Sequence, residues 1–123
     1  MDRFAGSYDK SLARAARAAV NEVLAVRKDE RVLLISNPGR EVREISMAIF
    51  DACLDVDAAP SLLFQREKGQ FDFAEEEVVK AMSAGPQVLI SMSNDRLGKD
   101  RWGMKNGYKG KRRYDHIFDF LYE

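Results

Sequence analysis

This sequence has one cysteine, one histidine and three prolines among its 123 residues. Because Cys53 and His116 are single copies, an internal disulfide is excluded, and so is a zinc site built from several cysteine and histidine ligands. Cys53 falls on the apolar stripe of a predicted helix, with no histidine near it in sequence. An apolar helix face raises the pKa of a thiol, so we expect Cys53 to be a structural residue and not a nucleophile.

The chain also lacks a long apolar run and an apolar core near its N-terminus. The sequence therefore predicts neither a membrane span nor a secretion signal, and we expect a cytoplasmic protein without membrane contact. Hydrophobic residues make up 46% and charged residues 33% of the sequence, as in soluble globular proteins. A chain of this length can bury roughly two-thirds of its extended surface, which is enough for one core.

Helical and strand-like segments alternate along the first 93 residues. Residues 9–26 have helical apolar spacing, and Ser7 or Asp9 can cap the helix start. The unbroken apolar run at 31–36 predicts a strand covered on both faces, and further strands are predicted at 60–65 and 87–93. Helices are predicted after residue 39, with Asp51 on the solvent side, and at 73–84. Right-handed crossovers then give a three-layer, Rossmann-like α/β domain with a short parallel sheet of strand order 2-1-3.

The segment 94–123 has a different character from this β-α-β-α-β core and its leading helix. The net charge of the whole chain is zero, yet residues 96–113 hold eight Lys or Arg and one Asp. We expect a basic loop there, followed by a terminal amphipathic helix with Tyr114, Ile117, Phe118 and Leu121 on one face. A helix at the chain end after only three strands suggests one part of a larger protein.

In an open parallel sheet, ligands bind beyond the carboxyl ends of the strands, where the strand order reverses. Our crevice candidates are therefore the polar residues and the glycine that follow the first and third strands: Asn37, Gly39, Ser93, Asn94 and Asp95. We expect Asn37 to cap the helix that follows it. The NPGREVRE turn has neither the three spaced glycines of a dinucleotide loop nor the Gly-Lys-Ser/Thr of a phosphate loop, so both standard nucleotide sites are disfavoured.

No catalytic residues are predicted in this chain, and neither are a metal site or a cofactor. The serines at the strand ends lack a Gly-x-Ser-x-Gly elbow, and Glu75, Glu76 and Glu77 stand where a helix dipole favours carboxylates. The candidates for contact with an anion lie in the basic segment: Lys99, Arg101, Lys111, Arg112 and Arg113. Nucleic acid is disfavoured as a partner, because a basic run alone is usually a solvated surface.

Three segments resemble the N-terminal domain of the thermophilic-type metallo-aminopeptidases, the aminopeptidase T and leucyl aminopeptidase group. Residues 26–34 take the place of the family's "vkpGErVlI" turn and strand, residues 56–60 of its "aGA-p" step, and residues 86–90 of its "aDvvI" strand. The likeness covers residues 12–93. Two glycines of the family pattern are replaced here, by Asp29 and Asp57.

The resemblance implies an N-terminal scaffold or lid lobe whose partner is a downstream catalytic domain of the same protein. The family's divalent metal ligands lie in that second domain, so none is carried over to this chain. Ring-opening dioxygenases of the dihydroxypyridine type have a similar architecture, which leaves the reaction of the parent protein open. The alternative is a small Rossmann-like module that binds an anionic ligand or nucleic acid. A homodimer is a further possibility, because a short sheet leaves open edges.

Overall fold

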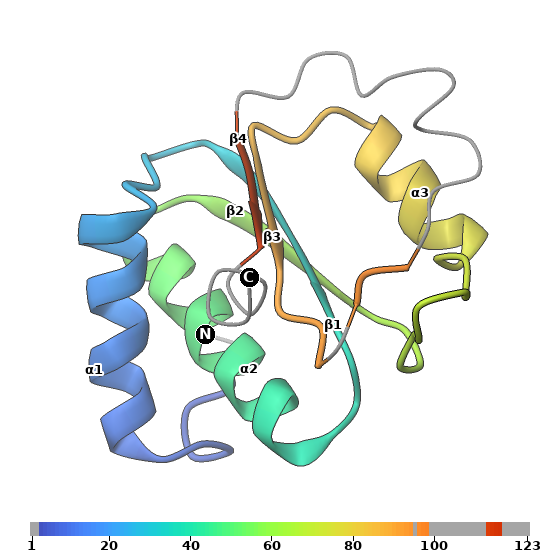
Figure 1. Cartoon of the computed structure of the whole chain (residues 1–123). Coiled ribbons are helices and arrows are strands. Elements are labelled where there is room, and N and C mark those ends of the chain that lie inside the picture. The colour runs from blue at the N-terminus through green and yellow to red at the C-terminus, as the bar shows by residue number, and fades with distance from the viewer. Residues whose placement is uncertain (1–2, 95, 99–112, 117–123) are drawn as a thin grey trace.

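The computed structural model describes residues 3–94 and 96–98, together with the backbone of residues 113–116. One helical stretch precedes an alternation of strands and helices (Figure 1). The elements in chain order are α1 (Lys10–Ala18), η1 (Ala19–Val23), β1 (Arg31–Ser36), α2 (Arg40–Asp55), β2 (Ala59–Phe64), α3 (Glu76–Ser83), β3 (Val88–Ser91) and β4 (Arg113–His116). None of the helices in these described ranges is long and apolar enough to cross a bilayer.

The sheet is parallel throughout, with strand order β2-β1-β3-β4. The predicted order 2-1-3 is confirmed, and β4 extends it beside β3. Arg31 pairs with Ala59 of β2, and Val32 pairs with both Pro60 of β2 and Val88 of β3. β1 is therefore the central strand of the described core, as its unbroken apolar run predicts.

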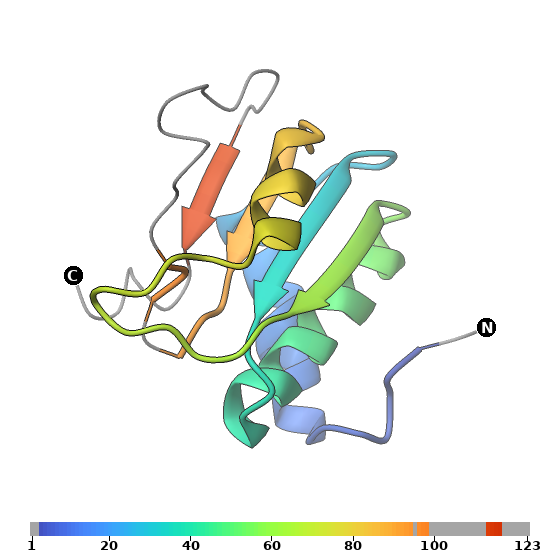
Figure 2. The ribbon, with the colours of Figure 1, turned by 90° about the vertical axis from the view of Figure 1, so that its right-hand side faces the viewer.

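Helices cover both faces of the sheet, which confirms the three-layer Rossmann-like architecture (Figure 2). Side chains of β1 alternate between the two cores. Val32 and Leu34 pack with α1 and α2, and Leu33 and Ile35 pack with α3. Cys53 of α2 is fully buried in the first core, and this burial raises its pKa to about 12. The prediction of a structural thiol is confirmed, because the thiolate form that reacts is suppressed.

The first helix has the predicted cap. Asp9 precedes α1, and its carboxylate accepts a hydrogen bond from the N–H of Ser11 at 3.1 Å. The helix continues beyond Ala18 as the wider π-helix η1, in which Leu24 donates to the carbonyl of Ala19 at 2.8 Å. The two pieces together fill most of the range predicted from the apolar spacing.

The predicted terminal helix is wrong over the residues that the structure describes. Arg113–His116 is a strand, and its residues pair in register with β3, from Val88 opposite Arg113 to Ser91 opposite His116. A four-residue piece has little helical preference of its own, so the backbone pairing offered by β3 decides its conformation. The other apolar positions of that prediction, Ile117, Phe118 and Leu121, lie outside the described residues.

The N-terminal segment, residues 3–8, lies against α2 and corrects a second expectation. Asp51, predicted to face solvent, is only 4% exposed. Its carboxylate accepts hydrogen bonds from the Tyr8 hydroxyl at 2.6 Å and the Phe4 N–H at 3.1 Å. The Phe4 ring packs edge-to-face on Phe50, with 5.3 Å between ring centroids. Helical periodicity could not predict this burial, because the covering segment is more than 40 residues away in sequence.

Candidate functional site

The predicted crevice lies at the carboxyl ends of β1 and β3. Of its candidate residues, Asn37 and Ser93 are buried, with exposed fractions of 0% and 2%, while Gly39 and Asn94 are exposed. Asp95 lies outside the described residues. The structure brings Asn37 and Asn94 into direct contact, as the reversal of strand order predicts.

Asn37 fills the position between the strands with its own side chain. Its amide nitrogen donates to the carbonyl of Gln65, just after β2, at 2.9 Å. Its amide oxygen accepts from the backbone N–H of Asn94, after β3, at 2.6 Å. The side chain thus joins the ends of the three strands β1, β2 and β3.

Because Asn37 makes these bonds, the prediction that it caps α2 is wrong. The N-cap residue of α2 is Gly39, which makes no side-chain hydrogen bond to the first turn. Pro38 and Gly39 carry the chain away from the strand end before the helix begins, so the Asn37 side chain stays with the sheet. Instead, the Arg43 guanidinium donates to the Pro38 carbonyl at 3.1 Å.

Gln65 forms a second connection at the same edge of the sheet. It is 5% exposed, its amide nitrogen donates to the Leu97 carbonyl at 2.7 Å, and its amide oxygen accepts from the Glu75 N–H at 3.1 Å. It therefore holds the start of α3 and the segment after β3 against the end of β2. A lone glutamine after a strand carries no sequence signal of such a role.

A charged cluster stands beside Gln65, at the rim of a polar hollow of about 590 Å³. The Glu75 carboxylate accepts from the Lys68 ammonium at 2.7 Å and from the Arg66 guanidinium at 3.0 Å. The Lys68 hydrogen bond, followed by that of Arg66, lowers the pKa of Glu75. Glu76 and Glu77 occupy the first turn of α3, as predicted, whereas Glu75 precedes the helix and pairs with these cations. Its ion pairs make Glu75 a poor proton donor at neutral pH.

The buried serines hold the strand ends to α2 and to each other. The Ser46 hydroxyl of α2 lies 2.6 Å from the Ser36 hydroxyl and 2.7 Å from the Val42 carbonyl oxygen. The hydroxyls of Ser91 and Ser93 lie 3.0 Å apart. Each of these serines is at most 2% exposed, so its hydroxyl is buried in the described structure.

The remaining candidates stay predictions. Lys99, Arg101, Lys111 and Arg112 lie outside the described residues, and of Arg113 only the backbone is described, in β4. Among the described side chains, no three His, Cys, Asp or Glu residues gather in a way that could hold a metal ion.

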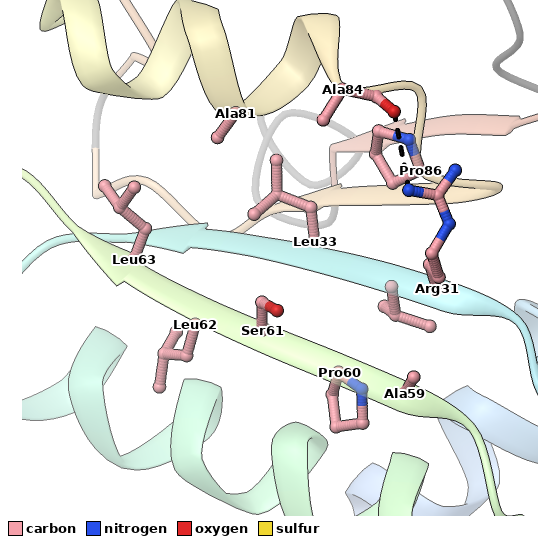
Figure 3. A pocket seen from close by; sticks show the side chains of 11 residues that line it. Arg31, Leu33, Ala59, Pro60, Ser61, Leu62, Leu63, Ala81, Ala84 and Pro86 are labelled. Carbon is pink, nitrogen blue, oxygen red and sulfur yellow. Dashed lines mark hydrogen bonds between the residues drawn. The ribbon is translucent and has the colours of Figure 1, made fainter.

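A different hollow, which the sequence did not predict, is lined by β1, β2, α3 and the turn that follows α3 (Figure 3). This apolar groove has a volume of about 470 Å³ and lies between α3, the amino-terminal half of β1 and most of β2, residues 59–63. Its lining includes Leu33, Ser61, Leu63, Ala81, Ala84 and Pro86. At one end the Arg31 guanidinium donates to the carbonyls of Ala84 and Gly85, at 3.4 and 2.5 Å. The groove exists because α3 covers β1 and β3 and leaves this face of β2 uncovered.

No family model, curated protein or solved structure matches this chain significantly.

Proposed function

We propose that this chain is a structural α/β lobe of a metallo-aminopeptidase-like hydrolase, with the metal ligands and catalytic groups supplied by another domain. The observation that carries the proposal is the closed strand-end edge. In this fold class that edge is where a ligand binds, and here Asn37 and Gln65 occupy it with hydrogen bonds to the chain's own backbone. A lobe whose crevice is filled in this way positions other parts of a protein rather than a small molecule.

The backbone at two turns supports the resemblance on which the hydrolase assignment rests. Asp29 and Asp57 stand where the aminopeptidase pattern has glycines, and both have positive φ angles, of 66° and 60°. Only glycine adopts this region without a steric cost. The Asp29 N–H also donates to the Asp57 carbonyl at 2.9 Å, so the two turns meet at the amino ends of β1 and β2. A glycine pattern at these two turns is what this backbone favours.

The native reading frame provides the first test. If this chain is such a lobe, the coding sequence continues past Glu123 into a segment with several Glu and His residues able to hold two divalent metal ions. A native stop codon directly after Glu123 would refute the proposal.

The alternative is a stand-alone module that binds an anion or a nucleic acid. One observation favours it: Gly39 leaves the first N–H groups of α2 without a side-chain cap, and such groups attract anions. Fluorescence anisotropy with labelled single-stranded RNA and DNA at low salt distinguishes the structural lobe from the binding module. The lobe predicts no binding, whereas the module predicts binding that weakens steeply as salt is added.

A further inference from the structure

We propose that the open edge of β2 is a homodimer interface, at which the β2 strands of two copies pair antiparallel across a two-fold axis. The result is one continuous sheet through both copies. This inference concerns the described core alone and does not depend on the hydrolase proposal.

Among the described residues, no strand pairs with the outer side of β2, so its backbone groups on that side have no strand partner there. Ala59 donates its N–H to the Glu30 carbonyl at 2.8 Å, and Gln65 donates to the Ser36 carbonyl at 3.0 Å, so the odd-numbered residues face β1. Because hydrogen-bonding directions alternate along a strand, Pro60, Leu62 and Phe64 point their backbone groups outward. Pro60 has no N–H, which leaves Leu62 and Phe64 as the outward donors of the strand.

The two edges of the sheet differ in their protection. Natural edge strands are commonly guarded against pairing by charged residues or by proline, and β2 has only Pro60, near its start. β4, at one edge, has the sequence Arg-Tyr-Asp-His, whereas β2, at the other, has Ala-Pro-Ser-Leu-Leu-Phe without a single charge. Antiparallel pairing of β2 with its own copy therefore brings no like charges together within the strand.

One register satisfies every outward donor of β2. When Leu62 lies opposite Phe64 of the second copy, the two residues exchange both of their backbone hydrogen bonds, and the two-fold axis repeats the exchange. Pro60, with its missing donor, lies beyond these central pairs. The strand is thus self-complementary in its hydrogen bonding as well as in its charge.

The same register buries apolar side chains that the single copy leaves uncovered. Phe64 is 41% exposed, and in the dimer its ring lies beside Leu62 of the second copy. The axis passes at Leu63, so the two Leu63 side chains meet on the α3 face. Leu63 lines the apolar groove (Figure 3), and the pairing would join the grooves of the two copies edge to edge.

Amide hydrogen exchange at increasing protein concentration tests the interface at single residues. The amides of Leu62 and Phe64 are expected to exchange more slowly as concentration rises. Those of Ser61 and Leu63, which face β1, are expected to show no such dependence. Exchange at Leu62 and Phe64 that does not change from micromolar to millimolar protein would overturn the proposal.

A charge placed on the edge gives an independent test. Ser61 is exposed on β2, and Ser61→Lys is expected to raise the dimer Kd by about tenfold or more, because the ammonium group loses water on pairing. Ala18→Lys introduces the same charge at an exposed position of α1 and is expected to dimerise like the wild type. Sedimentation velocity measures both. A Ser61→Lys protein that dimerises as tightly as the wild type contradicts the interface.

A backbone variant covers the case in which Ser61→Lys fails to fold. Phe64→Pro removes an outward donor without affecting the bonds to β1, while Phe64→Ser removes the ring and keeps the donor. We expect the dimer Kd to be higher for the proline variant than for the serine variant. Equal dimerisation of the two variants would exclude backbone pairing at this edge.

Discussion

At the scale of single residues, Asn37 shows why a polar group at a strand end is not by itself a binding site. The side chain is fully buried, and both ends of its amide are bonded to backbone groups. A buried amide with all of its partners inside the protein contributes to stability and offers nothing to a ligand.

Asn37→Ala is expected to lower the free energy of unfolding by about 2 to 3 kcal/mol, because the buried Gln65 carbonyl and the part-buried Asn94 N–H both lose their partner. Urea unfolding followed by circular dichroism measures the change. The matched control is Asn94→Ala, whose side chain donates to Glu67 at the surface and is expected to change stability by less than about 0.5 kcal/mol. Equal effects of the two substitutions would show that the buried connection is not stabilising.

The two aspartates with positive φ give the opposite kind of prediction. Asp29→Gly and Asp57→Gly are each expected to stabilise the fold by about 0.5 to 1 kcal/mol, since glycine relieves the steric cost of the left-handed region. The control is Asp55→Gly, in the last turn of α2, which is expected to destabilise by about 1 kcal/mol because glycine is unfavourable in a helix. Thermal melts compare the three variants. Destabilisation by either turn substitution would contradict the role given to the backbone.

Sequence reasoning at this scale could predict which residues end the strands but not what their side chains do. It placed Asn37 correctly beside β1 and assigned it to the wrong partner, because a cap is a local interaction and the true partners are 28 and 57 residues away. The prediction that Asp51 faces solvent was wrong for the same reason. A polar residue on a predicted helix is expected to face solvent, and local sequence cannot show that a segment distant in sequence covers it.

At the scale of elements, prediction succeeded where the local pattern had one solution. β1 was predicted at its exact bounds, since an unbroken apolar run between a charged turn and Asn-Pro-Gly allows only a buried strand. The prediction of a helix was wrong at residues 113–116. The apolar spacing that begins at Tyr114 suits a helix, but the neighbouring β3 pairs with this backbone as a parallel strand. Tertiary pairing overrides local preference in a segment this short.

The contact of the N-terminal segment with α2 predicts a specific dependence on pH. Burial, together with the hydrogen bond to Asp51, raises the pKa of Tyr8 from 10.0 to about 12. The folded state therefore holds the phenolic proton more tightly than the unfolded state. The stabilisation is complete below pH 10.0 and is lost as the pH rises through about 12.

Tyr8→Phe is expected to lower the free energy of unfolding by about 1 to 2 kcal/mol at neutral pH, because a hydrogen bond to a carboxylate is lost. The difference between wild type and variant should shrink as the pH rises above 10.0. Urea titrations at a series of pH values provide the measurement. A difference that stays constant up to pH 12 would mean that Tyr8 does not lose its proton as proposed.

At the scale of the whole molecule, the two kinds of surface lie at different places on the sheet: buried polar side chains at the carboxyl ends of the strands, and apolar surface along β2. The polar groups at the carboxyl ends of the strands bond to one another, while β2 and the groove beside it present apolar surface. The sheet order could be predicted from the alternation of elements, but the groove could not, because it depends on how far α3 extends over β2. Under our proposals, this apolar side is the surface that contacts other protein.

An assay of metal-dependent aminopeptidase activity tests the central claim most directly, that this chain is a lobe and the chemistry lies in another domain. The comparison is between this 123-residue chain and the protein encoded by its full native reading frame, which we propose to be longer, each with an aminoacyl p-nitroanilide and added Zn²⁺ or Co²⁺. We predict that the longer protein releases p-nitroaniline, that a chelator abolishes this release, and that the present chain alone releases none. Hydrolysis by the present chain, or no hydrolysis by the longer protein with either metal, would contradict the account.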